Sequence, residues 1–575
     1  MKNGDVLRLT MGDWQWNAAV VGFINIVGKN NVHFVNDSIE FSPELLEDFQ
    51  EKYFAYFFHD YGITLSWHKI VAFEDKMEAY KKNEFENFNL QALKSFNHYL
   101  KDVKRYIKSN SYKAAYKLIA SDVDMLSLEK QLAVAKEPKN QELFEMDKQK
   151  IIIDVKKNFT VLQQVISYCK SPQGKRYIRA KNVIYTIIKN AWNGVCFLNA
   201  QTKEQDVYTN YKGYFVGVAI EYLSQDKNNY KYNCFVCDAS IKDLTGDLSF
   251  LNATGFDVAR KSSHVWNFQN DIAICPLCRL VFSCLPAGLT YVYDRGIYVN
   301  VTIDLKKAVE INYKIHMDIL QRKEGNPRSV YPALVGALHE TEHDTAKYEL
   351  ADIQVVRYEN DSYRFNILSR KMLRIILESR KELDGLIKAV SVENGMNVRI
   401  YDEVINRIFN NQNLFTLIHR MLYHKLANPR NCYFNSAHIN HLLIMNQKIY
   451  KGLGGMRVEK QEGNRPKNQA LVRTARMAGQ ELKKRYSRKD AEHKLPGICY
   501  RLLNALKTSN KDMFMDVILN CYLYVKSPVP DVITNALSDE KDFSSMGYAF
   551  VSALIDETDK QANTALLDDE GEELQ

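Results

Sequence analysis

Cys234-Phe-Val-Cys237 is followed, after 37 intervening residues, by Cys275-Pro-Leu-Cys278, and these two CxxC pairs decide the fold of the middle of the chain. Four cysteines at this spacing are typical of one tetrahedral zinc site. Because all four ligands are thiolates, no coordination position remains for water or a substrate. The sequence therefore predicts a structural zinc ion, bound by Cys234, Cys237, Cys275 and Cys278, that staples two loops together.

The overall composition is that of a soluble globular protein. The chain has 575 residues, of which 46% are hydrophobic and 25% charged, so it is too long for one core. It lacks a signal peptide at its start and any run of about 18 apolar residues, so we expect a cytoplasmic protein without membrane contact. The six cysteines outside the two pairs are scattered, which favours reduced thiols over a disulfide framework.

Periodicity along the chain predicts an α+β, multidomain protein. The run Trp14–Val27 fits either a strand or a buried helix, and helical spacing dominates from Ser42 to about residue 170. Residues 207–223 and 289–303 are interpreted as strands flanking the zinc pairs, and 353–358 with 363–367 as a hairpin. The predicted parts are a mixed, mostly helical domain at 1–199, a zinc-stapled β-rich domain at 200–305, an α+β region at 306–450, a helical bundle at 456–560 and an acidic tail at 561–575.

Two cationic segments are candidates for nucleic-acid contact. The net charge of +8 is mild, so its distribution matters more than its size. Within residues 171–182, Pro172 and Gly174 predict a loop. Its four cations either hold phosphates or are solvated: Lys175, Arg176, Arg179 and Lys181. Between Met456 and Leu495 there are twelve Lys or Arg and five Asp or Glu. The predicted basic helical face there consists of Arg473, Arg476, Lys483, Lys484, Arg485, Arg488 and Lys489.

Enzyme motifs are incomplete. His264 and Asn267 lie between the CxxC pairs, as in some zinc-stapled endonucleases, but the segment contains no second histidine for such a site. His339-Glu-Thr-Glu-His343 matches the HExxH pattern of zinc proteases, but no third ligand can be assigned. Neither a nucleotide-binding P-loop nor a nucleophile elbow is present. A binding or scaffold protein is therefore favoured over an enzyme, with a stand-alone zinc-stapled endonuclease as the alternative.

A family resemblance is carried by two groups of residues. The first is Asp13-Trp14 with Asn17-Ala-Ala-Val-Val-Gly22-Phe23, and the second is the pair of CxxC motifs with Arg279-Leu-Val-Phe after Cys278. Together with the basic C-terminal region, they resemble the CXXC-CXXC large subunit of type I-B CRISPR effector complexes, also called Cascade. The resemblance covers the order and spacing of features along the whole chain.

This resemblance implies a non-catalytic subunit of an RNA-guided complex. Its expected partners are the guide RNA (crRNA), target double-stranded DNA with its displaced strand, other Cascade subunits and a helicase-nuclease that cuts. Such a subunit reads the short protospacer-adjacent motif on the duplex and starts the R-loop, while guide pairing supplies the remaining specificity. For the motif-reading loop, side-chain chemistry suggests Lys29, Asn30 and Asn31, and Lys175, Arg176 and Arg179. A generic nucleic-acid-binding scaffold outside CRISPR is a further alternative.

The C-terminal region also resembles the small subunits that hold the displaced strand in such complexes. Met456 follows Lys451-Gly-Leu-Gly-Gly455, whose codons can spell a purine-rich ribosome-binding sequence. We therefore hypothesise that residues Met456 to Gln575 are also made as a separate small-subunit product.

Overall fold

A computed structural model describes residues 6–254, 272–292, 295–302, 304–320, 330–340, 353–453 and 467–556. The chain divides into two compact units, Met1–Arg328 with Ile353–Phe365, and Ser329–Asp352 with Asn366–Gln575. The predicted α+β, multidomain class is confirmed, with a cysteine cluster in the middle and a helical C-terminal region. The finer domain boundaries drawn from the sequence stay predictions.

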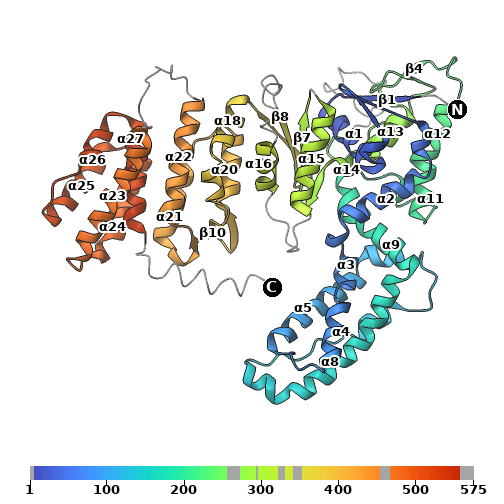
Figure 1. Cartoon of the computed structure of the whole chain (residues 1–575), viewed down its shortest axis with the longest axis horizontal. Helices are drawn as coiled ribbons and strands as arrows, with labels where there is room; N and C mark the ends of the chain where they lie inside the picture. The colour runs from blue at the N-terminus through green and yellow to red at the C-terminus, as the bar shows by residue number, and fades with distance from the viewer. Residues whose placement is uncertain are drawn as a thin grey trace. The chain divides into compact units, whose positions relative to one another are not determined.

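The first unit begins with a small sheet, a buried helix and a long helical segment (Figure 1). Its elements up to the cysteine region are β1 (Leu7–Thr10), α1 (Trp14–Val27), η1 (Lys29–Asn31), β2 (His33–Val35), β3 (Ser38–Phe41), η2 (Pro43–Leu46), α2 (Phe49–Asp60), η3 (Gly62–Thr64), α3 (Ser66–Val71), α4 (Glu74–Lys82), α5 (Leu90–Ile107), α6 (Asn110–Tyr116), α7 (Met125–Gln131), α8 (Gln141–Lys170), α9 (Pro172–Val183), η4 (Ile184–Ile188) and α10 (Lys189–Ala191).

The first unit continues through the cysteine region to a second sheet. These elements are η5 (Cys196–Leu198), α11 (Val207–Tyr211), η6 (Lys212–Gly217), α12 (Val218–Ser224), β4 (Tyr232–Asn233), β5 (Ser240–Ile241), α13 (Pro276–Ser283), α14 (Leu285–Gly288), β6 (Thr290–Val292), β7 (Arg295–Val301), α15 (Leu305–Leu320), β8 (Ile353–Glu359) and β9 (Ser362–Leu368).

Helix α1 resolves the ambiguity of the run at 14–27: it is a buried helix, not a strand. The Asp13 carboxylate caps its start by accepting hydrogen bonds from the backbone N–H groups of Gln15 and Trp16, both at 2.8 Å. Its residues are buried on nearly every side. The helix packs closely on α14, where Gly22 leaves room for the backbone of Cys284. A helix surrounded by protein loses its amphipathic pattern, which is why the sequence left both readings open.

Two sheets flank this helix. Strands β1, β3 and β2 form an antiparallel sheet in that order. Strands β6, β7, β8 and β9 form the second sheet. The predicted hairpin is confirmed as β8 and β9, joined at Asn360 and Asp361, which both have the positive φ of a tight hairpin turn.

A buried polar chain ties α1 to the second sheet. The Asn17 amide donates to the Oδ1 of Asn300 on β7 at 3.0 Å, and Asn300 donates to the Oε1 of Gln354 on β8 at 3.1 Å. Asn17 also exchanges hydrogen bonds with the backbone of Gly12. The buried amides of Asn17 and Asn300 are both paired, so these hydrogen bonds stabilise one placement of α1 on the sheet.

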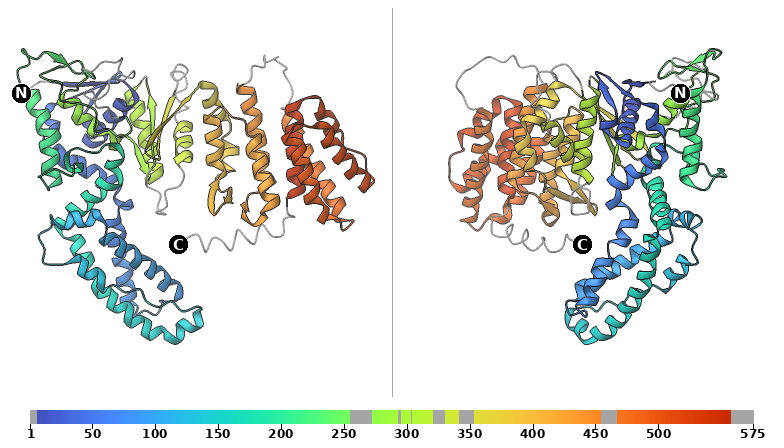
Figure 2. Two further views of the ribbon diagram at one scale, coloured as in Figure 1. Left: turned by 180° about the vertical axis from the view of Figure 1, so that it is seen from behind. Right: turned by 45° about the vertical axis from the view of Figure 1, so that its right-hand side comes forward.

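The helical segment from α3 to α9 has a core of its own, and Figures 1 and 2 show α3, α4, α5 and α8 side by side in blue to cyan. Its centre is aromatic: the ring of Phe159 on α8 lies 5.3 Å from that of Phe96 on α5 and 5.6 Å from that of Phe85. The helical spacing predicted from Ser42 to about residue 170 is confirmed.

The predicted loop at 171–182 is wrong, because these residues form helix α9. Ser171 is its N-cap, with Oγ accepting from the backbone N–H of Gly174, and Pro172 occupies the first helical position. Proline is favoured there because its missing N–H would have no helical partner. Gly174 is needed for close packing, since a Cβ atom at this position would lie 2.2 Å from the Tyr168 carbonyl oxygen.

The prediction of strands at 207–223 is also wrong, so the middle region is less β-rich than expected. Asp206 caps α11 by accepting from the N–H groups of Tyr208 and Thr209, and helical structure continues through η6 and α12. Tyr208, Tyr211 and Phe215 fall at helical spacing and pack inward. The strands predicted at 289–303 are present as β6 and β7.

The second unit is mainly helical. Its elements are α16 (Val330–Glu340), α18 (Arg370–Glu378), α19 (Arg380–Asp384), β10 (Val390–Glu393), β11 (Met396–Arg399), α20 (Ile400–Phe409), α21 (Phe415–Ala427), η9 (Pro429–Asn431), β12 (Cys432–Tyr433), α22 (Ser436–Leu453), α23 (Lys467–Ser487), η10 (Glu492–Lys494), α24 (Leu495–Lys507), α25 (Lys511–Val525), α26 (Asp531–Asn535), η11 (Ala536–Ser538) and α27 (Glu540–Ile555). The three strands form one small antiparallel sheet in the order β11, β10, β12.

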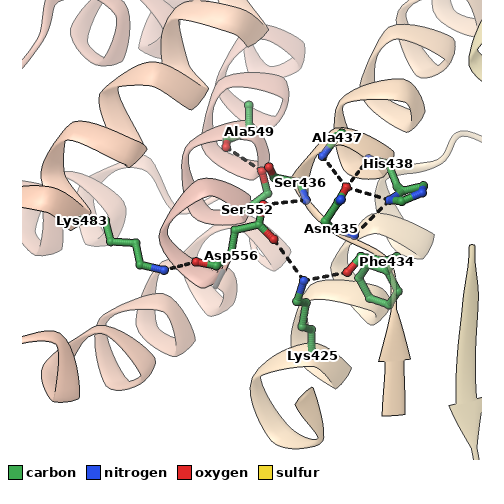
Figure 3. Close-up of polar contacts among 10 residues, drawn as sticks. All are labelled: Lys425, Phe434, Asn435, Ser436, Ala437, His438, Lys483, Ala549, Ser552 and Asp556. Atoms are coloured by element: carbon green, nitrogen blue, oxygen red, sulfur yellow. Dashed lines mark hydrogen bonds and ion pairs between the residues drawn. The ribbon is translucent and has the colours of Figure 1, made fainter. Parts of the chain in front are cut away.

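Helix α27 is the centre of the C-terminal bundle, which is drawn in red in Figure 2. Every residue from Phe543 to Leu554 is buried, because α23 and α24 pack on it together with α21 and α22. Just after the helix, the Asp556 carboxylate accepts from Lys425 Nζ at 3.2 Å and from the Ser436 N–H at 3.1 Å (Figure 3). The bundle is therefore joined to α21 and α22 by apolar packing and by these two hydrogen bonds of Asp556.

Candidate metal centre and nucleic-acid surfaces

The first CxxC pair lies on a tight hairpin. Strands β4 and β5 pair through Tyr232 with Ile241 and Asn233 with Ser240, and the cysteines occupy the turn between them. The turn is closed by a hydrogen bond from the Cys234 N–H to the Ala239 carbonyl oxygen at 2.8 Å, and Asp238 has a positive φ of 59°. The Phe235 N–H donates to the Ala273 carbonyl oxygen at 2.9 Å, which brings the hairpin to the second pair.

The second pair brackets the first turn of α13. Cys275 is the N-cap, and its Sγ accepts from the Cys278 N–H at 3.4 Å, while Pro276 occupies the first helical position. The Cys275 N–H donates to the Cys234 Sγ at 3.2 Å. Backbone N–H groups and the positive end of a helix favour thiolates, the form of cysteine that binds metal.

The four sulfur atoms form one compact cluster. All lie within 4.8 Å of one another, and Cys237 Sγ is 3.6 Å from Cys275 Sγ. A tetrahedron with zinc–sulfur distances of about 2.3 Å has sulfurs about 3.8 Å apart. Three of the cysteines are buried, Cys237 is exposed, and none is in a disulfide. The cluster can hold one metal ion, and a set of four thiols suits zinc.

Hydrogen bonds within the cluster affect its protonation. Those from Cys237, Cys275 and Cys278 lower the pKa of the Cys234 thiol. The same contacts raise the pKa of the Cys275 and Cys278 thiols, and metal binding requires all four thiols to be deprotonated. The helix that follows then anchors the cluster, because α13 packs on α1 and the ring of Phe282 lies 5.1 Å from that of Trp16. The two segments that carry the family resemblance thus meet in the core of the first unit.

Lys29, Asn30 and Asn31 form the single turn of η1 directly after α1, and all three are exposed. Gly28 makes this turn possible, since its φ of 86° suits glycine best. The Asn31 side chain donates to the Val27 carbonyl oxygen at 2.6 Å and closes the end of the helix. Lys29 and Asn30 therefore face solvent from a fixed backbone, as a base-reading or phosphate-binding turn requires.

A cleft of about 540 Å³ opens beside Lys29, between α1, α2 and α15. In its wall the Asp60 carboxylate lies 2.9 Å from His316 Nε2 and 2.5 Å from His59 Nδ1. Burial opposes ionisation of Asp60, but the hydrogen bonds and charges of His316 and His59 outweigh it and lower its pKa. Sequence reasoning missed this cluster, because Asp60 and His316 are far apart in the chain and no motif joins them.

Arg176 and Arg179 make intramolecular contacts on α9. The Arg176 guanidinium donates twice to the Glu51 carboxylate, at 2.7 and 2.9 Å, and stacks 3.5 Å above the ring of Tyr208. Arg179 donates to the Phe58 carbonyl oxygen at 3.1 Å and lies over the Phe58 ring. Lys175 is exposed on the same helix. Their binding to phosphates stays a prediction, and the two arginines also join α9 to α2.

Arg176→Ala is expected to destabilise the first unit by about 1–2 kcal/mol, because a bidentate, ring-stacked pair is lost. Arg176→Lys restores little, since an ammonium group provides neither the fork nor the stacking. Urea denaturation measures both, with Lys175→Ala as the control that leaves stability within about 0.5 kcal/mol. A variant of Arg176 that keeps full stability but loses nucleic-acid affinity would show that this side chain serves binding instead.

The predicted basic face lies on and just after α23, and the structure divides it in two. The side chains of Arg473, Lys484 and Arg488 are exposed and make no hydrogen bond or ion pair with the described residues. They follow each other at 11 and 4 residues, which places them along one stripe of the helix. The remaining four are Arg476, Lys483, Arg485 and Lys489.

Three of these four make contacts within the chain. Lys483 donates to the Asp556 carbonyl oxygen (Figure 3), and Arg485 pairs with Glu481 at 3.0 Å and donates to Ser527. Lys489 donates to the Tyr524 carbonyl oxygen at 2.6 Å. Arg476 is partly buried, and its Nε has no hydrogen-bond partner in the part of the chain that the structure describes. The exposed stripe of three is therefore the part of the face most open to a ligand.

Several candidate residues fall outside the described residues. His264 and Asn267, the nuclease candidates, lie there, as does His343 of the HExxH-like motif. Met456 and the predicted acidic tail at 561–575 also lie outside. Among the residues that are described, no helix has both the length and the apolar composition needed to cross a membrane.

Comparison with known proteins gives one match. Residues 227–290, which contain both CxxC pairs, match the model of a family described as CRISPR-associated protein (Cas_CXXC_CXXC). Searches of curated proteins and of solved structures found no match. The matched segment contains the hairpin and helix that bring the four sulfurs together, and the resemblance to a CRISPR-associated CXXC–CXXC family is confirmed. The chain thus carries the CXXC–CXXC segment of a CRISPR-associated protein.

Proposed function

We propose that this chain is the non-catalytic large subunit of a type I-B CRISPR RNA-guided surveillance complex. In this role it recognises the protospacer-adjacent motif on duplex DNA, helps to start R-loop formation and recruits a helicase-nuclease. The observation that carries the proposal is the four-cysteine cluster inside the segment that matches a CRISPR-associated family. The order of the other sequence features along the chain supports the narrower assignment.

The metal we propose is zinc with a structural role. Four thiolates complete its coordination, so the ion cross-links two segments of the chain and leaves no coordination site for water or a substrate. It joins the β4–β5 hairpin to α13, which packs on α1. The proposed role of the centre is therefore to hold the matched segment against the helix that leads to Lys29 and Asn30.

The reading of a short DNA motif is assigned to the turn at Lys29, Asn30 and Asn31. Lysine and asparagine are donors that suit base edges and phosphates, and this turn is exposed on a rigid helix end. Guide pairing supplies the remaining specificity, so a few such side chains are enough.

A tagged pull-down from the native cell tests the assignment, with bound RNA sequenced and proteins identified by mass. We expect repeat-derived guide RNA together with backbone subunits of the complex. A chain that purifies alone and free of RNA contradicts the proposal. Metal-dependent cleavage of DNA by the purified chain contradicts its non-catalytic part.

Charge reversal of the exposed stripe is expected to weaken binding of single-stranded DNA. With Arg473, Lys484 and Arg488 all changed to Glu, the slope of log affinity against log salt falls by about 2, since each phosphate contact contributes about 0.7. Fluorescence anisotropy across a salt series measures it.

The matched control changes three exposed cations elsewhere in the second unit, Lys371, Lys388 and Arg430, to Glu. The net charge changes equally, so a loss confined to the stripe variant locates the contact on α23. Equal losses in both variants would instead assign the effect to net charge alone.

A separate product beginning at Met456 remains part of the proposal, and the contacts of α27 bear on it. Such a product would lack α21 and α22, which cover part of α27 in the full chain. It would also lack Lys425 and Ser436, the groups that donate to the Asp556 carboxylate. Its α27 would therefore expose apolar surface unless another surface covered it. Silent recoding of codons 451–455 that leaves the set of translated products unchanged contradicts this part of the proposal.

A further inference from the structure

Two exposed tyrosines lie together where α21 meets α24. Tyr423 on α21 is 43% exposed and Tyr500 on α24 is 47% exposed, and their ring centroids are 5.8 Å apart. The ring of His419, one turn before Tyr423, lies 6.2 Å from it and nearly parallel. The three rings make a row on the surface of the second unit, which we call the aromatic row.

The aromatic row rests on a packed base. The ring of Tyr548 on α27 lies 6.2 Å from His419 and 5.7 Å from Phe415, and its hydroxyl is 3.5 Å from His419 Nδ1. Because α27 is buried along its length, the support beneath the row is rigid. Aromatic side chains with few rotatable bonds, held on a rigid support, bind a ligand with little loss of entropy.

The charged residues on the two helices that carry the row are all positive. Neither α21 nor α24 contains an Asp or Glu. Tyr500, Asn504 and Lys507 follow one another at helical spacing, so Lys507 lies on the same face as Tyr500. Burial and the charge of Lys507 lower the pKa of His419. Arg501 is exposed next to Tyr500.

We propose that Tyr423 and Tyr500 form a stacking platform for unpaired nucleobases of a single strand, with Lys507 and Arg501 at its phosphates. Exposed rings bordered by cations suit a single strand, which presents a base face and a phosphate at every nucleotide. An apolar protein partner would leave these cations without counter-charges. The identity of the ligand as nucleic acid rests on the proposed function; the platform itself is a separate surface from the stripe on α23.

Anisotropy of a labelled oligonucleotide with the full-length chain tests the platform, in DNA and RNA arms. Tyr423→Ala with Tyr500→Ala is expected to weaken binding about tenfold or more, because stacking contributes strongly for each base. Tyr423→Phe with Tyr500→Phe keeps the rings and the affinity. An abasic oligonucleotide of the same length has the phosphates without the bases, so the alanine variant and the wild type bind it alike.

The control is Tyr185→Ala with Tyr232→Ala, two tyrosines of the first unit that are 40% and 41% exposed. We expect this variant to bind as the wild type does. Suppose that the wild type binds the strand and that the α23 stripe variant binds it more weakly. If the alanine variant of the row then binds as well as the wild type, the platform is wrong and the proposed function stands. If the wild type binds no strand at all, both are wrong.

Photo-cross-linking gives a readout that needs no substitution. An oligonucleotide with iodinated bases is bound to the wild-type chain and irradiated, and the cross-linked peptides are identified by mass. We expect the peptides that contain Tyr423 or Tyr500. Cross-links that form only elsewhere on the chain would overturn the platform, even if the alanine variant did not fold.

Discussion

Cys278→Ser is expected to abolish metal binding and to lower the thermal stability of the first unit sharply. Cys278 is fully buried at the first turn of α13, and its sulfur lies within 4.8 Å of the other three. Structural zinc contributes its binding free energy directly to folding, and that free energy is of the order of 10 kcal/mol in small zinc domains. We expect metal content to fall from about one ion per chain to none, and the unfolding temperature of this unit to fall by about 10 °C or more.

The matched control is Cys432→Ser, because Cys432 lies in the second unit and outside the cluster. Its metal content and the stability of the first unit should equal those of the wild type. Elemental analysis and thermal unfolding report the two properties, and a strong chelator should reproduce the Cys278→Ser result with the wild-type chain. A first unit that stays folded at the same temperature without metal would contradict the structural role of the centre.

Gly22→Ala is expected to destabilise the first unit by about 3 kcal/mol or more. A Cβ atom at Gly22 would lie 2.0 Å from the Cys284 carbonyl oxygen and 2.8 Å from the Gly288 nitrogen. Both neighbours are backbone atoms, so no side-chain rotation relieves the clash, and α1 must move away from α14. The two helices are equally close at the glycine on α14, since a Cβ atom at Gly288 would lie 1.8 Å from the Ala18 carbonyl oxygen.

Gly213→Ala is the control for this prediction. Gly213 lies in the helical segment η6, and apart from the adjacent backbone no atom lies within 4 Å of a Cβ built there. Alanine should leave stability unchanged or raise it by about 0.5–1 kcal/mol, because it restricts the unfolded chain. Urea denaturation of both variants measures the difference. Equal midpoints for Gly22→Ala and Gly213→Ala would contradict the close packing of α1 on α14.

The metal centre was predictable because its chemistry is local. Two CxxC pairs leave few arrangements other than one four-thiol site, and the structure brings the four sulfurs together. The C-terminal helices were predictable for a similar reason: apolar residues such as Leu502, Leu503 and Leu506 recur at helical spacing, whatever they pack against. The hairpin of β8 and β9 was predictable from the polar residues of its turn.

The errors arose where one pattern fits two structures. Tyr208, Tyr211 and Phe215 resemble a strand by composition, since aromatic residues favour sheets, but the Asp206 cap starts a helix. Pro172 fits a loop, but proline is equally favourable in the first turn of a helix, which is where it lies. In both cases the cap residue just before the segment was the signal that decided the structure.

The sequence by itself determined the four cysteines of the cluster, the mixed helical and sheet composition and the family resemblance, because each depends on residues close together in the chain. Only the tertiary structure decided which cations are bound within the chain and which are exposed. Arg176 pairs with Glu51, and Lys483 donates to the Asp556 carbonyl oxygen. Arg473, Lys484 and Arg488 stay exposed. The tertiary structure also decided that Tyr423 and Tyr500 lie side by side and that Gly22 meets Gly288. These pairs are distant in sequence, and their contact depends on how helices pack, which no local pattern records.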